Sequence, residues 1–209
     1  MSEALHLFVA GGLVMYPLAF CSIVVVAIAI ERFMYYRKAQ SDMEKLIAEM
    51  PLLLGKNDIA GLKELLKADG GFPAMTIDTA VDHLGLNANQ NAIVEGAASH
   101  GAALLRNYLN YLDVIVTMSP LLGLLGTVTG MISSFSVLSI SEGQPFAITA
   151  GVGEALIATA TGLLVAILAL IAHTYLSHRL DGLVSDMERI SSVYLAHVDN
   201  VRAGVSHEA

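Results

Sequence analysis

Residues 112–138, LDVIVTMSPLLGLLGTVTGMISSFSVL, and residues 146–175, FAITAGVGEALIATATGLLVAILALIAHTY, decide the fold of this chain. Each stretch is longer than the roughly 20 mostly apolar residues that a helix needs to cross a hydrocarbon core about 30 Å thick. A third stretch of this kind covers residues 5–30. The whole chain is 55% hydrophobic and only 14% charged, which is typical of a membrane protein and not of a soluble globular domain.

These runs predict an all-α integral membrane protein with three transmembrane helices. A closed β-barrel is the other structure that can span a bilayer, because it also satisfies every backbone polar group internally. A barrel would show short segments of alternating polarity instead of continuous apolar runs. The continuous runs therefore favour helices.

Positively charged residues predict the topology. All eleven lysines and arginines lie either between the first and second apolar runs or after the third. Because cytoplasmic segments carry the excess of Lys and Arg, the N-terminus is expected outside and the C-terminus inside. The predicted organisation is an extracytoplasmic N-terminus (1–4), transmembrane helices (5–30, 112–138 and 146–175), a cytoplasmic helical segment (31–111), an extracytoplasmic loop (139–145) and a cytoplasmic C-terminal helix and tail (176–209).

Helical periodicity continues outside the apolar runs. Apolar residues recur at helical spacing in residues 43–50 and 59–66, and a short helix is expected at 73–83. From about residue 88 the pattern runs into the second apolar run, which predicts one helix over 88–138 with Pro120 as a candidate kink. The third helix is predicted to continue to about residue 198, with the last ten residues frayed.

Small residues form faces on the second and third predicted helices. Gly123, Gly126 and Gly130 lie within two turns of the second helix, and Gly162 belongs to a similar face on the third. Lipid tails supply no hydrophobic force between helices, so such faces serve close backbone approach. We therefore predict that these four glycines pack helices together. Three helices cannot bury both faces completely, so the faces also predict partners.

Thr127 and Thr159 are predicted to lie at a similar depth. Each lies sixteen residues from Gly143, the middle of the connection between the second and third helices. Two antiparallel helices that rise 1.5 Å per residue then bring both hydroxyls to one level, where they would form a polar ring. The alternative is local, because a Thr hydroxyl in a membrane helix commonly bonds to a carbonyl of the preceding turn.

Glu154 lies inside the third apolar run, near its predicted outer end. A carboxylate within a span is costly and usually marks an ion or proton path. The alternative is an interfacial acid whose carboxylate stays in water. Glu154 and Thr159 lie about 140° apart around the helix. They therefore either contact different neighbours or line a lumen wide enough to include adjacent faces.

No enzymatic motif stands out, and we expect no enzyme. The sequence has no glycine-rich phosphate loop with a lysine, no HExxH, no CxxC and no GxSxG. Its one cysteine, Cys21, excludes an intramolecular disulfide. We expect no metal site and no organic cofactor, and nothing in the charge pattern predicts a nucleic-acid partner.

Three segments resemble one known family. GGLVMYPLAFCSIVVVAIAIERF (11–33), PLLGLLGTVTGM (120–131) and QPFAITAGVGEALIATATGLLVAI (144–167) are similar to the three transmembrane helices of the ExbB, TolQ and MotA proton-channel proteins, and most similar to the ExbB type. The likeness covers the order and spacing of all three helices and is weaker over residues 39–90. MotA-like stators have four spans, so the chain fits them poorly.

The resemblance implies a subunit of an inner-membrane motor that uses protons as the coupling ion. ExbB-like proteins form a homopentameric ring in the lipid bilayer around the transmembrane helices of an ExbD-like dimer. The complex energises a TonB-like protein for transport across the outer membrane. By the resemblance, Thr127 and Thr159 line the lumen and Glu154 is the family's third-helix glutamate. The essential protonatable Asp belongs to the ExbD-like partner.

Other functions stay open on the sequence. A TolQ-like subunit would work with TolR-like and TolA-like partners in maintaining the envelope during division. A structural scaffold would form a membrane ring that anchors partners and conducts nothing. A small-solute transporter is disfavoured, because the three spans show no inverted repeat and no broken helix for a midplane substrate site.

Overall fold

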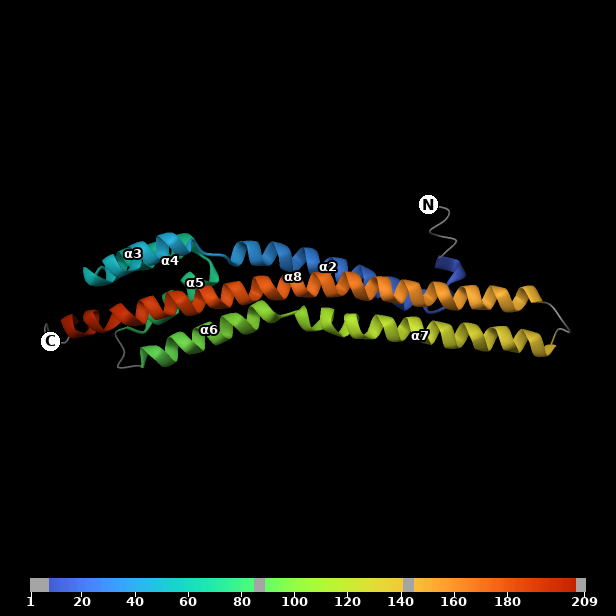
Figure 1. Ribbon diagram of the computed structural model, residues 1–209. Helices are drawn as coiled ribbons and strands as arrows, with labels where there is room; N and C mark the ends of the chain where they lie inside the picture. The colour runs from blue at the N-terminus through green and yellow to red at the C-terminus, as the bar shows by residue number, and fades with distance from the viewer. Residues whose placement is uncertain (1–7, 85–88, 141–144, 206–209) are drawn as a thin grey trace. The chain divides into compact units, whose positions relative to one another are not determined.

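The computed structural model describes residues 8–84, 89–140 and 145–205 (Figure 1). Every regular element in these ranges is an α-helix, which confirms the predicted all-α class. The labelled helices are α2 (Met15–Ala39), α3 (Met43–Gly55), α4 (Ile59–Asp69), α5 (Phe72–Asp82), α6 (Gln90–Arg106), α7 (Leu109–Ile140) and α8 (Pro145–Val205). The predicted N-terminal segment 1–4 and most of the predicted loop 139–145 lie outside the described residues.

Three helical stretches are long and apolar enough to cross a membrane, as the sequence predicts. Their 18-residue windows reach mean hydropathies of 2.0, 1.7 and 2.5 in chain order, and at most 33% of any window is buried within the chain. Large apolar side chains therefore remain uncovered, such as Leu121 on α7 and Leu164 on α8, which are 65% and 58% exposed. Surface of this kind requires lipid or other protein chains to cover it.

α2 begins later than the apolar run that contains it. The run starts at residue 5, whereas α2 starts at Met15 and continues to Ala39. Gly12 causes the difference, because its φ of 71° is left-handed and ends the helical turn at residues 8–10. The chain enters α2 through a hydrogen bond from the Met15 N–H to the Gly12 carbonyl (3.2 Å). Over residues 8–30, the part of the predicted 5–30 helix that the structure describes, the chain is thus a turn followed by the start of a longer helix.

The prediction of one continuous helix over 88–138 is wrong. α6 ends at Arg106 and α7 begins at Leu109. Between them Tyr108 has a φ of 68°, a left-handed conformation that non-glycine residues rarely adopt and that a right-handed helix cannot continue through. Pro120, in contrast, lies within α7 without ending it. α8 also continues to Val205, beyond the predicted end near residue 198.

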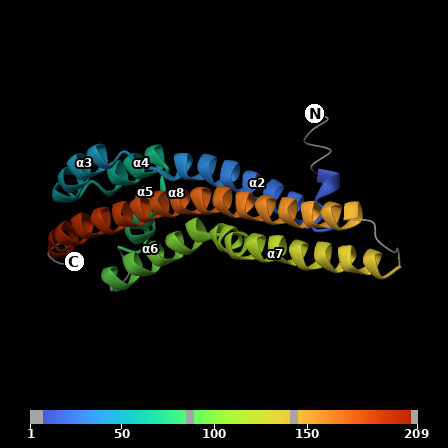
Figure 2. The same cartoon turned by 45° about the vertical axis from the view of Figure 1, so that its right-hand side comes forward.

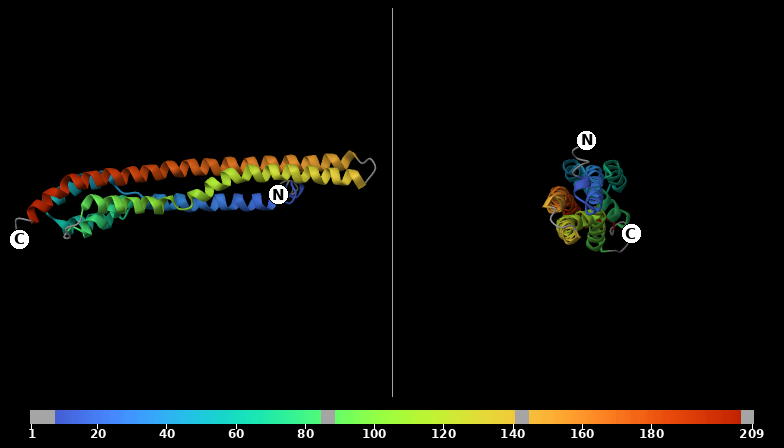
Figure 3. Two further views of the ribbon diagram at one scale, coloured as in Figure 1. Left: turned by 90° about the horizontal axis from the view of Figure 1, so that it is seen from below. Right: turned by 90° about the vertical axis from the view of Figure 1, so that its right-hand side faces the viewer.

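The chain divides into two compact units. The first contains Met1–Glu31 and Tyr108–Leu176, and the second contains Arg32–Asn107 and Ser177–Ala209. Within the first unit, α7 and the N-terminal part of α8 lie side by side (Figure 2). Within the second unit, the short helices α3 to α6 gather along the C-terminal part of α8 (Figure 3).

Local sequence signals set the short helices of the second unit. The Asp42 and Asp58 side chains accept backbone N–H bonds at the first turns of α3 and α4, at 3.1 Å and 2.9 Å. Such N-caps satisfy N–H groups that have no partner within the helix. Gly70 ends α4 in the left-handed conformation (φ 70°). The three short helices predicted from apolar spacing are confirmed as α3, α4 and α5.

One apolar core holds the second unit together. Five helices contribute side chains that are at most 2% exposed, for example Leu46 of α3, Leu62 of α4, Ile77 of α5, Val94 of α6 and Ile190 of α8. Tyr194 also lies in this core, and its hydroxyl donates to the Gln90 side-chain oxygen at 3.0 Å. Burial of each large apolar side chain contributes about 1.5–3 kcal/mol in water. The hydrophobic effect therefore stabilises this unit.

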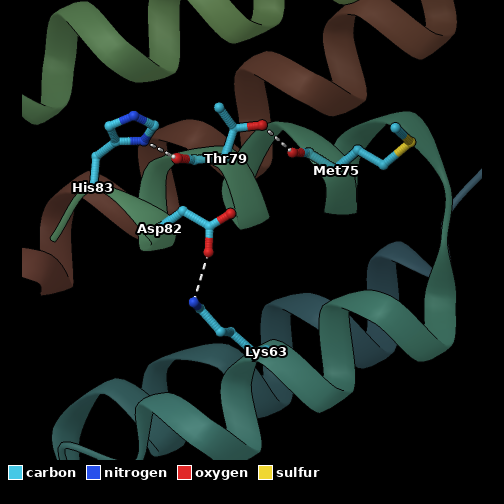
Figure 4. A network of polar contacts seen from close by, with 5 residues as sticks. All are labelled: Lys63, Met75, Thr79, Asp82 and His83. Atoms are coloured by element: carbon cyan, nitrogen blue, oxygen red, sulfur yellow. Dashed lines mark hydrogen bonds and ion pairs between the residues drawn. The ribbon is translucent and has the colours of Figure 1, made fainter.

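A surface ion pair joins α4 to α5. The Lys63 ammonium lies 2.6 Å from the Asp82 carboxylate (Figure 4). Their hydrogen bond raises the pKa of Lys63 and lowers the pKa of Asp82. The neighbouring polar groups bond within α5: the Thr79 hydroxyl donates to the Met75 carbonyl at 2.9 Å, and His83 Nδ1 lies 2.8 Å from the Thr79 carbonyl (Figure 4).

The ion pair predicts a pH dependence of stability with two limits. The pKa of Asp82 is lowered from 3.8, so its contribution is present above that value and is lost as the pH falls through the folded-state pKa. The pKa of Lys63 is raised from 10.5, so its contribution is present below that value and is lost as the pH rises through the folded-state pKa.

Asp82→Asn is therefore expected to lower the Tm slightly at neutral pH and to make no difference in strong acid. The effect is small because water screens exposed pairs. Thermal unfolding of the full chain in detergent across the pH range checks this. Glu64→Gln, which removes an exposed carboxylate of α4 that is not part of this ion pair, is the control. An equal Tm change in both variants at every pH would contradict the assignment.

Candidate functional site

Glycines allow α7 and α8 to approach backbone to backbone. A Cβ added to Gly162 would lie 2.6 Å from the Ser119 carbonyl oxygen and 2.9 Å from the Gly123 Cα. A Cβ added to Gly123 would lie 3.1 Å from the Thr159 Cα. Backbone atoms cannot yield to a new side chain as a flexible side chain can, so any other residue would push the helices apart.

The same contact continues along the first unit at two further glycines. A Cβ on Gly126 would overlap the Cβ of Ala158. A Cβ on Gly130 would lie 3.2 Å from the Cβ of Ala155. The structure therefore places all four predicted glycines in the contact between α7 and α8.

These contacts also fix the relative depth of the two threonines. Since residue 126 faces 158 and residue 130 faces 155, Thr127 lies opposite Ile157, two residues from Thr159. At a rise of 1.5 Å per residue, Thr127 and Thr159 differ in depth by about 3 Å. This geometry agrees with the similar depth expected from the sequence.

The two threonine hydroxyls have different partners. Thr127 Oγ1 donates to the Leu124 carbonyl of its own helix at 2.6 Å. Thr159 Oγ1 donates across the contact to the Gly123 carbonyl of α7 at 3.0 Å. Each hydroxyl has one proton and two lone pairs, so both oxygens can still accept a hydrogen bond. Thr127 is thus satisfied locally, whereas Thr159 also ties the two helices together.

Glu154 packs against the turn that precedes α2. Its carboxylate occupies the space that a Cβ on Gly12 would need, and its Cδ would lie 2.8 Å from that Cβ. One turn further along α8, Ile157 would lie 3.2 Å from a Cβ on Gly11. The Glu154 side chain is half-buried. Within one chain, Glu154 and Thr159 therefore contact different neighbours, which is one of the two arrangements that their angular separation allows.

The unit that contains Glu154 supplies no lysine or arginine to neutralise its carboxyl group. The first unit, residues 1–31 and 108–176, has no lysine and no arginine in its sequence. α2 carries no charged residue before Glu31, and α7 carries none after Asp113. The cost of placing a carboxyl group in such a setting is reduced by protonation, by hydrogen bonds to water or by a partner from outside the chain. Among the residues that the structure describes, no cluster of His, Cys, Asp and Glu could hold a metal ion.

A profile match identifies the family. Residues 73–189, more than half of the chain, match the MotA/TolQ/ExbB proton channel family. The chain belongs to this family. The family predicted from the sequence is thereby confirmed. Family membership and three membrane-capable helices together describe a multi-pass membrane protein of a proton channel family.

Individual members of the MotA/TolQ/ExbB family are similar to the chain over different lengths. The putative biopolymer transport protein ExbB-like 3 of Synechocystis is 33% identical over 167 residues, which cover 78% of this chain and 79% of the relative. The Tol-Pal system protein TolQ of Haemophilus influenzae is 40% identical over 83 residues (39% and 36%). The biopolymer transport protein exbB1 of Vibrio cholerae is 39% identical over 82 residues (38% and 36%). The last two matches do not separate the ExbB type from the TolQ type.

Sequence reasoning missed two features of this family member's first unit. The turn at Gly11 and Gly12 forms part of the surroundings of Glu154, and its signal was the Gly-Gly pair inside an apolar run. Ser119 is fully buried, and its hydroxyl has no hydrogen-bond partner in the structure. A serine beside Pro120 in an apolar helix gave no signal of that burial.

The second unit has a separate groove between α6 and α8. Its cavity volume is about 560 Å³, and Val94 and Met187 form part of its lining. Two glutamates, Glu95 and Glu188, also lie along it, and no basic residue does. The groove lies in the second unit, whereas Glu154 and the threonines lie in the first.

Gly162→Ala is expected to destabilise the first unit by about 1–3 kcal/mol, because the added methyl group meets backbone atoms of α7. Gly153→Ala is the matched control, since nothing lies within 4 Å of its added Cβ. Removing a helical glycine there should be neutral or stabilise by about 0.5–1 kcal/mol. Thermal unfolding of the two variants in detergent compares them. Equal stability would mean that α7 and α8 do not approach this closely.

Proposed function

We propose that this chain is the ring-forming subunit of an inner-membrane motor of the ExbB type, driven by the proton-motive force. Together with an ExbD-like one-span partner it energises a TonB-like protein and thereby transport across the outer membrane. Membership of the proton channel family carries the proposal, and the ExbB-like relative that matches over most of both chains supports the ExbB type. In this proposal the N-terminus lies outside, and the second unit and the C-terminus lie in the cytoplasm.

The uncovered apolar surface of the first unit supports a ring. Its spanning windows are at most 33% buried within one chain, and small residues such as Ser133 on α7 and Ala160 on α8 are exposed. Helices in a bilayer associate through such residues. A homopentamer around two partner helices buries them, and lipid covers the rest.

The proposed mechanism uses the polar groups of the first unit as the wall of a proton path. The partner's Asp is protonated at the level of Thr127 and Thr159, whose oxygens retain acceptor capacity. Protonation removes the cost of exposing a carboxylate to an apolar wall, so the neutral partner helix is free to move against the ring. Release of the proton on the other side restores the charge. Glu154 lies near the outer mouth of this path.

A TolQ-like role is the second candidate, and the TolQ relative of Haemophilus influenzae supports it. A TolQ-like chain would restore envelope integrity, and not receptor-dependent uptake, in cells that lack both native subunits. Complementation of each defect separates the two roles. A chain that restores neither, while assembling normally, would favour a non-conducting scaffold.

Thr127→Val is expected to abolish proton-driven uptake without changing assembly. The hydroxyl bonds only within α7, so its loss breaks no contact between helices. The matched control is Thr129→Val, which removes a hydroxyl that also bonds back within α7, to Leu125 and Gly126. Two residues along a helix turn the side chain by about 200°, away from the Thr127 face.

Accumulation of a labelled substrate of a TonB-dependent receptor, in cells that carry each variant, gives the readout. Normal uptake with Thr127→Val at normal protein levels would overturn the proton path at this position. Thr159→Val is less suitable, because it also removes the bond to the Gly123 carbonyl. Loss of one such interhelical bond in a membrane costs about 0.6–2 kcal/mol.

The ring itself predicts a defined stoichiometry. Native mass spectrometry of the full chain, released from detergent alone and after co-expression with a one-span partner that carries a membrane Asp, is expected to give a pentamer that takes up two partner copies. A monomer or dimer that ignores the partner would contradict both the ring and the proton path through it.

A further inference from the structure

The Gly11–Gly12 turn holds its shape through backbone hydrogen bonds. The Gly12 N–H donates to the Val9 carbonyl at 3.4 Å, and the Gly12 carbonyl accepts from the Met15 N–H at 3.2 Å. Gly12 has a φ of 71°, which residues with a side chain rarely adopt. The turn is therefore a fixed structure in which residue 12 presents bare backbone.

The bare backbone of Gly12 is where the Glu154 carboxylate lies. A Cβ on residue 12 would overlap Oε1 of Glu154 and approach its Cδ to 2.8 Å and its Cγ to 3.3 Å. Both α8 and α7 contact this turn, since Ile157 lies beside Gly11 and a Cβ on Gly126 would lie 3.7 Å from that of Val14. The carboxylate thus packs against a surface that the rest of the unit holds in place.

The position of the carboxyl group at this turn is set by packing and not by a charged partner in the first unit. The N–H groups at the start of α2 are already used, because those of Met15 and Tyr16 donate to the Gly12 and Leu13 carbonyls at 3.2 Å and 3.4 Å, and Pro17 has none. The sequence of the unit contains no lysine or arginine that could pair with the Glu154 carboxyl group. The ionisable side chains that α2 brings nearest in sequence are Tyr16, which is 66% exposed, and Cys21, which is buried.

We propose that Gly12 is a positioning residue for Glu154: its left-handed, Cβ-free backbone seats the carboxyl group at the start of α2 and so sets where this carboxyl exchanges protons. This inference rests on the proposed function, because it gives Glu154 a defined place at the mouth of the proton path. Any side chain at position 12 displaces the carboxyl group from the turn. The displaced group then lies further from the start of α2 and is less covered.

The first test measures the position of the carboxyl group in the unaltered protein. In full chain labelled with ¹³C and reconstituted in lipid, solid-state NMR is expected to give a short-range cross-peak between the Gly12 Cα and the Glu154 carboxyl carbon. The Glu154 signal is assigned by its loss in Glu154→Gln. Absence of the cross-peak, with both signals assigned, would overturn the proposal.

The second test displaces the carboxyl group. Gly12→Ala adds the overlapping Cβ, and Gly12→Asn adds a side chain that tolerates the left-handed conformation better. Both are expected to shift the Glu154 carboxyl ¹³C signal and to raise its rate of modification by a hydrophobic carbodiimide several-fold, read by mass spectrometry of the intact chain. Gly153→Ala, beside Glu154 but with nothing within 4 Å of its Cβ, is expected to change neither.

Unchanged signal and rate in a folded Gly12 variant would overturn the proposal, as would an equal change in Gly153→Ala. If neither Gly12 variant folds, the cross-peak in the unaltered protein decides alone. Neither measurement needs a proton gradient, a partner or uptake. Normal uptake with Thr127→Val would therefore contradict the proposed function but would not bear on the contact between Glu154 and Gly12. A missing cross-peak would contradict that contact but would not bear on the ring or on the role of the threonines.

Discussion

Close backbone approach between α7 and α8 is the constraint on which the first unit depends. In a bilayer no hydrophobic force draws apolar helices together, so contact distance decides whether they associate. Gly123 and Gly162 bring the two backbones within reach of each other, and the Thr159 hydroxyl can then donate to a carbonyl of the opposite helix. The polar groups of this unit are placed by that contact, because it sets the register of one helix against the other.

The two units are stabilised by different kinds of packing. The second unit buries leucines, isoleucines and valines from five helices in one core, and caps its short helices with Asp42, Asp58 and Gly70. The first unit leaves most residues of its spanning windows uncovered and packs α7 against α8 through small residues. A chain built in this way has one unit with an apolar core of its own and one unit whose apolar surface needs lipid or partners to cover it, as expected of a member of a membrane proton channel family.

The candidate site lies in the first unit, the one that leaves its apolar surface uncovered. Glu154 is an acidic side chain in a unit whose sequence contains no lysine or arginine, so its position in the unit matters more than that of an exposed acid. Packing, and not a charged partner within the unit, fixes the position of Glu154: its carboxyl group lies against the backbone of Gly12, beside the start of α2. Thr127 and Thr159, at nearly one depth, provide two further polar groups of the unit.

The sequence by itself determined the helical class, the three spanning runs, the short helices of the second unit and the packing glycines, because apolar length, periodicity and small-residue spacing are local properties of the chain. It did not determine the break at Tyr108 or the start of α2 at Met15, since left-handed conformations depend on what the surrounding structure stabilises. Nor could it pair Glu154 with Gly12, which lie more than 140 positions apart. Only the packing of the N-terminal turn on α8 decides that contact, because it depends on distance in space and not on spacing along the chain.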